Sequence, residues 1–569
     1  MIFDKNIDIP LRDGLGLLRG NLYRPIAPGR YPVLVTYGPY GKDLPYSDFN
    51  AHSFGEIPEE QKSKYSAWEV PEPTYWTRHG YAVLRVDERG IGSSFGFLDT
   101  MSDQTSSDFA EVIEWAADQP WSSGKIGLLG ISYYGGSQWR VAARKPKGLA
   151  CIIPWEGMTD YYRDRVRHGG IYSNKFVSFW WNNQVRPMQY GNPEKQSRQF
   201  GPDCAEGART ADQLVERRRD QTIDNRDHRY LDEQYHDSRV YQLSDIEVPV
   251  LSVANLGGIM LHLRGNVVGY LEAGTPNKWL YFISGRHDLP FYLPHYVELQ
   301  KSFLDAWLQD KDNRGWKLGP NVKVPAVSVL ERRGNPGHNS NEAEATYTSR
   351  GEAEWPLART RYTKFHLQPD LTLSETSSTE SKTFPLEALG KSEPLQFEVT
   401  FDKETEIAGH PLMSLAYSVE RREDGTHPKD IDVFVTLRHI DPQGQEVFYT
   451  GTAGDPVPLC KGWLRASVRK INEQSPRHRD WLPHRDYLST EVDYLKPDVV
   501  YVLVVEIWPT ACIVAPGGKI IAEVATGDTQ GGGIFLHNDP VDRNEQDFGG
   551  VNVLHVGDRY NSYLVLPLV

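Results

Sequence analysis

Short apolar runs alternate with helix-period segments along the first half of the chain, and this alternation limits most strongly how the chain can fold. Each run ends at glycine, proline or a polar turn. Residues 108–119 place Phe109, Val112, Ile113 and Ala116 at helical spacing, with acidic residues on the other side. Strands separated by helices predict a parallel sheet with crossover connections, and so an α/β fold. The runs are YPVLVTYGPYGK (31–42), HGYAVLRVDERGIGSS (79–94), GKIGLLGIS (124–132), VPVLSVAN (248–255) and KWLYFISG (278–285).

The alternation stops at about residue 155 and resumes near residue 241. The intervening stretch is rich in Tyr, Trp, Arg and Asp, which predicts an inserted helical cap. After residue 318 the chain shows short apolar strands separated by turns, and the Asp-Pro-Gln-Gly of residues 441–444 suits a type I turn. We therefore predict a sheet domain over 1–154 and 241–318, a helical cap over 155–240 and a β-sandwich over 319–569.

Charge and composition exclude several classes of function. The chain has 62 basic and 76 acidic residues, and its net charge of −14 argues against nucleic-acid binding through a basic surface. No apolar run approaches the roughly 18 residues that a membrane span needs. The N-terminal segment MIFDKNIDIPLRDG lacks the apolar core of a signal peptide. We expect a cytoplasmic protein with no membrane partner.

The spacing of cysteine and histidine residues indicates no metal site. The cysteines are far apart and form no CxxC pair, so buried thiols are expected. His168 and His262 have no companions at ligand spacing. The glycines of residues 87–94 (DERGIGSS) are not followed by the G-K-[ST] of a phosphate loop. We therefore expect no cofactor. The four cysteines are Cys151, Cys204, Cys460 and Cys512.

Ser132 stands between a predicted buried strand and a predicted helix. Gly130 precedes the serine by two positions and Gly135 follows it by three. Small neighbours are what a tight strand-to-helix turn needs to hold a nucleophilic hydroxyl over the carboxyl edge of a parallel sheet. The N–H of Tyr133 can then donate to a developing oxyanion. The spacing is G-x-S-x-x-G rather than G-x-S-x-G, so an ordinary turn serine is the alternative interpretation.

A histidine follows a later strand of the predicted sheet. His287 comes directly after the segment KWLYFISGR, residues 278–286. Because the carboxyl ends of parallel strands meet at one edge, its imidazole can take the Ser132 proton and later return it to the leaving group. We therefore predict Ser132 as the nucleophile and His287 as the general base. An ordinary hydrogen-bonding role is the alternative for His287.

The segment GISYYGG (130–136) and several further segments occur together in one order along the chain. The further segments are IPLRDGLGLLRGNLYRP (9–25), GYAVLRVDERGIGSSFG (80–96), IPWEGMTDYYRD (153–164), EIAGHPLMSLAYS (406–418) and GWLRASVRKIN (462–472). This set resembles the CocE/NonD family of cocaine esterase and X-prolyl dipeptidyl-peptidase hydrolases. The resemblance covers nearly the whole chain, but the family includes esterases, acylases and peptidases, so it indicates the fold more strongly than the substrate.

The resemblance implies an α/β-hydrolase sheet with a helical cap and a C-terminal jelly-roll β-sandwich. In the family the sandwich covers part of the site, and it is a candidate surface for assembly into a homo-oligomer. The family's second oxyanion donor falls on Tyr40, in TYGPYGKD (36–43). Its phenol can donate one hydrogen bond while the Tyr133 N–H supplies the other. The alternative is that Tyr40 only packs in its turn.

The resemblance supplies no residue for the acid of a catalytic triad. The position where the family's aspartate falls is Gly258, and residues 248–271 contain no Asp or Glu. A Ser–His dyad without an acid is one option. Loss of the acid costs about 10⁴ in turnover, so a dyad would need a substrate that is easy to cleave. This favours an ester, lactone or thioester over an amide. The substitutes that remain open are Asn255, the adjacent Asp288, and Glu156 with Asp160 at the start of the cap.

We predict a serine hydrolase that cleaves a small acyl ester or amide through an acyl-serine intermediate. The substrate is expected between the sheet edge and the cap, with Trp155, Trp180 and Trp181 as wall residues. One alternative is a transacylase that passes the same acyl group to an alcohol or amine. Another is a degenerate hydrolase fold that serves as a binding protein. The missing acid motivates this last alternative, and retention of the nucleophile and the base argues against it.

Overall fold

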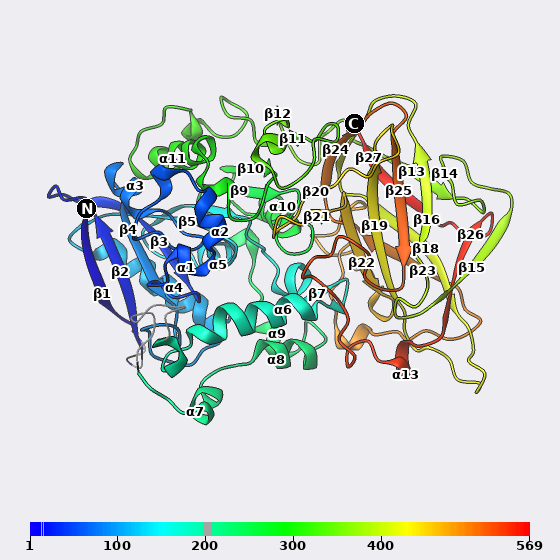
Figure 1. Ribbon diagram of the computed structural model, residues 1–569, viewed down its shortest axis with the longest axis horizontal. Helices are drawn as coiled ribbons and strands as arrows, with labels where there is room; N and C mark the ends of the chain where they lie inside the picture. Colours follow the sequence, from blue (N-terminus) through cyan, green and yellow to red (C-terminus); the bar gives the residue numbers. More distant parts are fainter. Residues whose placement is uncertain (13, 15, 197–206) are drawn as a thin grey trace.

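The protein is described by a computed structural model, which covers residues 1–12, 14, 16–196 and 207–569. A ten-stranded sheet with its helices lies beside a C-terminal β-rich part (Figure 1). The central strands, from β4 to β11 in sheet order, are all parallel, which confirms the predicted α/β fold. In sheet order the strands are β1 (Ile2–Pro10), β2 (Leu17–Arg24), β4 (Ala82–Asp87), β3 (Tyr31–Gly38), β5 (Ser122–Ile131), β6 (Leu149–Trp155), β9 (Val250–Asn255), β10 (Lys278–Ile283), β11 (Val327–Glu331) and β12 (Thr348–Glu352).

Helices cover both faces of this sheet. Successive residues of a strand point to opposite faces, so neighbouring residues pack against different helices. Leu128 shares a core cluster with residues of α4 (Asp103–Asp118) and α5 (Tyr133–Ala143). Its neighbour Leu129 shares another cluster with residues of α11 (Pro294–Leu308). Burial on both faces explains why these strands are continuous apolar runs in the sequence.

The described part of the stretch between β6 and β9, residues 156–196 and 207–249, consists mainly of short helical segments. Its Arg167 is fully buried and pairs with Asp542 of the C-terminal part at 2.8 Å, which ties the two parts together. The α-helices of this stretch are α6 (Asn174–Trp180), α7 (Ala211–Glu216), α8 (Gln221–Asp227) and α9 (Gln234–Asp237).

The C-terminal part is a β-sandwich, as predicted. Its larger sheet contains β13 (Arg361–Leu367), β14 (Leu373–Ser374), β15 (Ser381–Glu387), β17 (Thr405–Gly409), β18 (Leu412–Val419), β23 (Tyr501–Glu506), β24 (Thr510–Val514), β26 (Val551–Gly557) and β27 (Tyr563–Leu568). Its smaller sheet contains β16 (Leu395–Thr400), β25 (Lys519–Ala525), β19 (Asp432–Ile440) and β22 (Cys460–Arg465).

Two strands that follow the predicted boundary at residue 319 belong to the first sheet. β11 pairs with β10 in parallel, and β12 pairs with β11 antiparallel, so both belong to the ten-stranded sheet and not to the sandwich. The physical reason is that β10 would otherwise be an edge strand with unpaired backbone groups. Pairing with β11 satisfies those groups.

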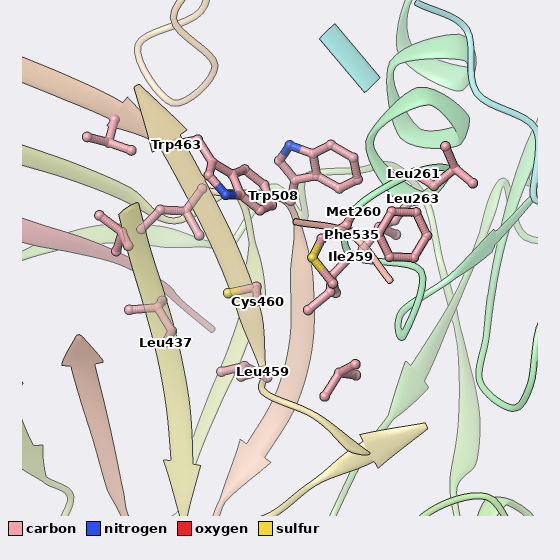
Figure 2. Close-up of a cluster of buried hydrophobic side chains, with 14 of the residues drawn as sticks. Ile259, Met260, Leu261, Leu263, Leu437, Leu459, Cys460, Trp463, Trp508 and Phe535 are labelled. Atoms are coloured by element: carbon pink, nitrogen blue, oxygen red, sulfur yellow. The ribbon is translucent and has the colours of Figure 1, made fainter. Parts of the chain in front are cut away.

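A buried hydrophobic cluster joins the sheet domain to the sandwich (Figure 2). Ile259, Met260 and Leu261 come from the loop before α10 (Leu263–Glu272), whereas Trp463 and Trp508 come from the sandwich. All five side chains are at most 4% exposed. Because burial of apolar area favours association, this loop is fixed against the sandwich.

Of the four cysteines, Cys151, Cys460 and Cys512 are free and buried, as expected. Cys204 lies outside the described residues. Within the part of the chain that the structure describes, no helix combines the length and the apolar character that crossing a bilayer requires.

Candidate active site

Ser132 occupies a strained turn between β5 and α5. Its backbone has φ 61° and ψ −117°, a conformation that residues with a side chain rarely adopt. Its N–H donates to the carbonyl oxygens of Trp155 (3.0 Å) and Glu156 (3.1 Å), which holds the turn against the end of β6. Tyr133 is the first residue of α5, so its N–H has no acceptor within the helix. Such a turn presents the serine hydroxyl at the carboxyl edge of the sheet.

Two glycines make room for this turn. A Cβ at Gly130 would lie 2.5 Å from Cβ of Tyr134, and a Cβ at Gly135 would lie 2.6 Å from the carbonyl oxygen of Trp155. Both distances are far below a van der Waals contact, so a larger residue fits neither position without movement. The glycines that the sequence places around Ser132 are therefore required by the close approach of α5 to the sheet.

Ser132 Oγ lies 3.2 Å from Nε2 of His262, a residue to which the sequence analysis gives no role. Nδ1 of His262 accepts a hydrogen bond from the Met158 N–H (3.2 Å). The His262 ring stacks parallel to that of His287, with centroids 5.1 Å and planes 6° apart. Burial, and then the charge of His287, hold the pKa of His262 well below its ordinary value. Its position in the loop after β9, at the same sheet edge as the nucleophile, is the sequence signal that could have identified His262.

The structure brings Glu156 to the other histidine, His287. Oε2 of Glu156 lies 2.8 Å from Nδ1 of His287, and its Oε1 accepts a hydrogen bond from Nδ2 of Asn255 (3.1 Å). Asn255 was considered from the sequence as a partner of the His287 ring. In the structure its side chain donates to Glu156. Glu156 is fully buried and has φ 41°, and its N–H donates to the Val253 carbonyl (2.9 Å). The surrounding backbone thus fixes the carboxylate against the imidazole.

A second carboxylate faces Nε2 of His287. Oε1 of Glu69 lies 3.2 Å from that nitrogen. Burial opposes a charge on His287, but the carboxylates of Glu156 and Glu69 raise its pKa well above the ordinary value. Burial also raises the pKa of Glu69 to about 7, against the effect of its hydrogen bond with His287. The two groups are therefore coupled, and the charge of each one affects the titration of the other. Glu69 was missed because it lies outside every recognised motif.

Tyr40 approaches the nucleophile from beyond the end of β3. Its hydroxyl accepts a hydrogen bond from Nε1 of Trp180 (2.9 Å), which leaves its own proton to donate. Burial, and then Glu69, raise the pKa of Tyr40 well above its ordinary value, while hydrogen bonds with Trp180 and Ser132 oppose the rise. Tyr40 is therefore a neutral donor beside Ser132. The Trp180 ring also stacks on that of Tyr133, with centroids 6.0 Å apart.

Three other residues predicted for the site make their contacts elsewhere in the structure. Asp288 accepts a hydrogen bond from the Tyr46 hydroxyl (2.9 Å) and pairs with Arg286 (2.9 Å). Trp155 and Trp181 are fully buried, and the ring of Trp155 packs in the core cluster that contains α11 residues. The structure thus brings Trp180 to Tyr40 and Tyr133 and leaves the other two tryptophans in the core.

The sandwich supports the loops that carry the site. The His287 N–H donates to the Thr452 carbonyl (3.2 Å), in the loop between β20 (Tyr449–Thr450) and β21 (Pro456–Val457). A Cβ at Gly257 would overlap the carbonyl oxygen of Thr450, so the loop after β9 touches the sandwich backbone. The C-terminal part therefore fixes both histidine-bearing segments from outside the sheet.

These components are those of nucleophilic acyl transfer: a hydroxyl on a strained turn, an imidazole with a carboxylate on Nδ1, and two donors for an oxyanion. No set of three His, Cys, Asp or Glu side chains among the described residues could hold a metal ion.

Comparison with known proteins agrees with this fold and with a hydrolase. Residues 13–287 match the model of the X-Pro dipeptidyl-peptidase (S15) family, and residues 321–565 match that of the X-Pro dipeptidyl-peptidase C-terminal non-catalytic domain. The cocaine esterase of Rhodococcus sp. (strain MB1 Bresler) is 23% identical over 642 aligned positions, which cover 99% of this chain and 98% of that protein.

Solved structures extend the likeness. A CocE/NonD family hydrolase from Staphylococcus aureus is 27% identical with a TM-score of 0.84, over 100% of this chain and 94% of that one. An α-amino acid ester hydrolase, 15% identical with a TM-score of 0.66, covers 100% of this chain and 96% of its own, and it supports the fold alone. The chain is therefore a serine hydrolase with an α/β-hydrolase fold. It belongs to the CocE/NonD family, as the resemblance implies.

Proposed function

We propose that the protein hydrolyses a small acyl ester or amide through an acyl-serine intermediate. The hydrogen bond of 2.8 Å between Glu156 and His287, buried at the sheet edge that carries the strained Ser132 turn, is the observation that supports this most. A carboxylate on Nδ1 fixes the imidazole tautomer that can accept a proton at Nε2, and it stabilises the imidazolium that forms.

The proposed acylation begins when Nε2 of His287 gives up its contact with the Glu69 carboxylate and forms a hydrogen bond with Ser132 Oγ. His287 takes the hydroxyl proton as Oγ attacks the carbonyl carbon, and Tyr40 and the Tyr133 N–H donate to the oxyanion. The bond to the leaving group then breaks, and His287 returns the proton to that group. Water repeats the sequence on the acyl-serine, which releases the acid and restores Ser132.

An ester is the substrate that we favour. With Glu156 as the proposed acid, the argument from a slow Ser–His dyad no longer applies. The support for an ester is the likeness to a cocaine esterase over 99% of this chain. The S15 model carries a peptidase name, so an amide is the second candidate. Parallel assays with p-nitrophenyl esters and X-Pro p-nitroanilides separate the two, because each substrate releases a coloured product.

A fluorophosphonate probe tests the proposed nucleophile. We expect covalent labelling that is lost in Ser132→Ala and retained in Ser137→Ala, a matched change in the same helix. Folded protein that takes up no probe at any pH would contradict the proposal and would favour a binding protein.

A further inference from the structure

The hydrogen bonds of His262 fix the position of its proton. Nδ1 accepts from the Met158 N–H at 3.2 Å, so this nitrogen carries no proton. Burial keeps the ring neutral, and a neutral imidazole that accepts at Nδ1 carries its proton at Nε2. Nε2 is the atom that lies 3.2 Å from Ser132 Oγ. The ring is therefore oriented as a donor toward the oxygen of the nucleophile.

We infer that His262 is a catalytic hydrogen-bond donor to Ser132 Oγ and not a second general base. As a base it would need a free lone pair at Nε2 and a proton at Nδ1, where the Met158 N–H already points. Both ring nitrogens of His287, in contrast, face carboxylates, which suits a residue that gains a proton. The inference rests on the proposed acyl-serine mechanism, and it assigns different functions to two parallel rings.

The donor matters most when the bond between the acyl carbon and Oγ breaks. In deacylation, water adds to the acyl carbon while His287 takes one of its protons. The electron pair of the C–Oγ bond then returns to Ser132 Oγ, which receives that proton from His287 as the carboxylic acid leaves. His262 keeps its own proton throughout and donates a hydrogen bond to the charge that develops on Oγ. Without this donor the acyl-enzyme accumulates.

The fold holds His262 rigidly enough for this function. Its neighbours Met260, Leu261 and Leu263 are at most 4% exposed and belong to the cluster between the sheet domain and the sandwich (Figure 2). The Met158 N–H and the stacked His287 ring fix the rotation of the imidazole. A donor that is already in place needs no reorganisation as charge develops, which is the condition for transition-state stabilisation.

Pre-steady-state hydrolysis of p-nitrophenyl acetate by the full chain tests this inference. In His262→Leu we expect the burst of p-nitrophenol to remain, while steady-state deacylation falls about 10²-fold and acetyl-enzyme becomes visible by intact mass spectrometry. His262→Gln places an amide N–H near the position of Nε2, and we expect it to recover most of the lost deacylation rate. Ser132 labelling by fluorophosphonate and thermal unfolding establish that each variant is folded; His262→Met replaces the leucine variant if that one unfolds.

Two results would overturn the inference. If the leucine and glutamine variants both lose the burst to the level of His287→Ala, then His262 is a base. If both keep the wild-type deacylation rate, His262 takes no part in the reaction. A wild-type protein that shows neither labelling nor a burst would remove the proposed function and this inference together. Wild-type labelling with unchanged His262→Leu kinetics removes this inference alone.

Discussion

The carboxylate of Glu156 faces Gly258: a Cβ at position 258 would lie 3.6 Å from Oε2 of Glu156. The two residues follow β6 and β9, which are neighbours in the sheet. A carboxylate can therefore reach His287 from the end of either strand. This relationship explains how a chain with no acid after β9 still pairs its imidazole with a carboxylate.

The first prediction concerns the acid. Glu156→Gln keeps the shape of the side chain but removes the charge that orients His287 and stabilises its imidazolium. We expect kcat/KM for p-nitrophenyl acetate to fall roughly 10³–10⁴-fold, with little change in KM. Asp288→Asn is the matched control, because Asp288 pairs with Arg286. An equal loss in both variants, with both folded, would contradict the assignment of Glu156.

The second prediction moves the acid to the neighbouring strand. Glu156→Gly suits the positive φ of 41° at that position and empties the space that faces Gly258. Adding Gly258→Asp supplies a carboxylate from the end of β9. We expect the double variant to regain a measurable part of the activity that Glu156→Gly loses. Gly258→Asn in the same background is the uncharged control, and equal recovery by both would show that charge is not what restores function.

Much of the fold could be predicted because its causes are local. Leu128 and Leu129 face opposite sides of a covered sheet, so their strand appears as an apolar run that pattern alone identifies. The glycines around Ser132 mark the turn for the same reason, since they are needed where α5 touches the sheet. The C-terminal domain model begins at residue 321, close to the predicted boundary at 319. β11 and β12 nevertheless extend the first sheet; they are as short as sandwich strands, and only pairing assigns them to it.

The rest of the site depends on contacts between distant segments, which the sequence does not encode locally. The sequence could not firmly rank Asn255, Asp288, Glu156 and Asp160 as substitutes for the acid. The choice follows from how the ends of β6 and β9 meet. His262 and Glu69 stand in no motif. Their proximity to Ser132 and His287 results from loop conformations that the sandwich and the sheet fix together.

The third prediction is a pH shift. Burial opposes a charge on His287, but the carboxylates of Glu156 and then of Glu69 raise its pKa. A general base must be neutral to accept a proton, so kcat/KM falls as the pH drops through that pKa. Glu69→Gln removes the negative charge and lowers the pKa of His287. The acidic limb of the pH–rate profile should therefore move to lower pH. The buried Glu72, three residues away, gives the control Glu72→Gln, and an acidic limb that moves equally in both variants would count against Glu69.

The fourth prediction separates two neighbouring tyrosines. Tyr40→Phe removes a proposed oxyanion donor, and we expect kcat to fall about 10²-fold with KM nearly unchanged. Tyr133→Phe keeps the backbone N–H that is the other proposed donor. It removes a hydroxyl that donates to Glu88 (2.6 Å) and accepts from the Met101 N–H (3.1 Å). Its kcat should stay much closer to that of the wild type. If the Tyr133 variant loses as much as the Tyr40 variant, the phenol of Tyr40 has no special part in the reaction.

The fifth prediction concerns the stability of the turn that presents the nucleophile. A Cβ at Gly135 would lie 2.6 Å from the carbonyl oxygen of Trp155, so Gly135→Ala forces α5 away from the end of β6. Overpacking of this kind costs about 1–3 kcal/mol, and thermal unfolding should show a lower Tm.

The same displacement moves Ser132, so fluorophosphonate labelling should slow in protein that is still folded. Gly55→Ala is the matched control, because Gly55 lies in α2 (Ala51–Glu56) and the added Cβ would meet nothing within 4 Å outside its own helix backbone and chain neighbours. Alanine in a helix gains about 0.5–1 kcal/mol over glycine, so this control should unfold at the same temperature or higher and label at the wild-type rate. Unchanged labelling in Gly135→Ala would mean that the close approach of α5 to β6 does not set the position of the nucleophile.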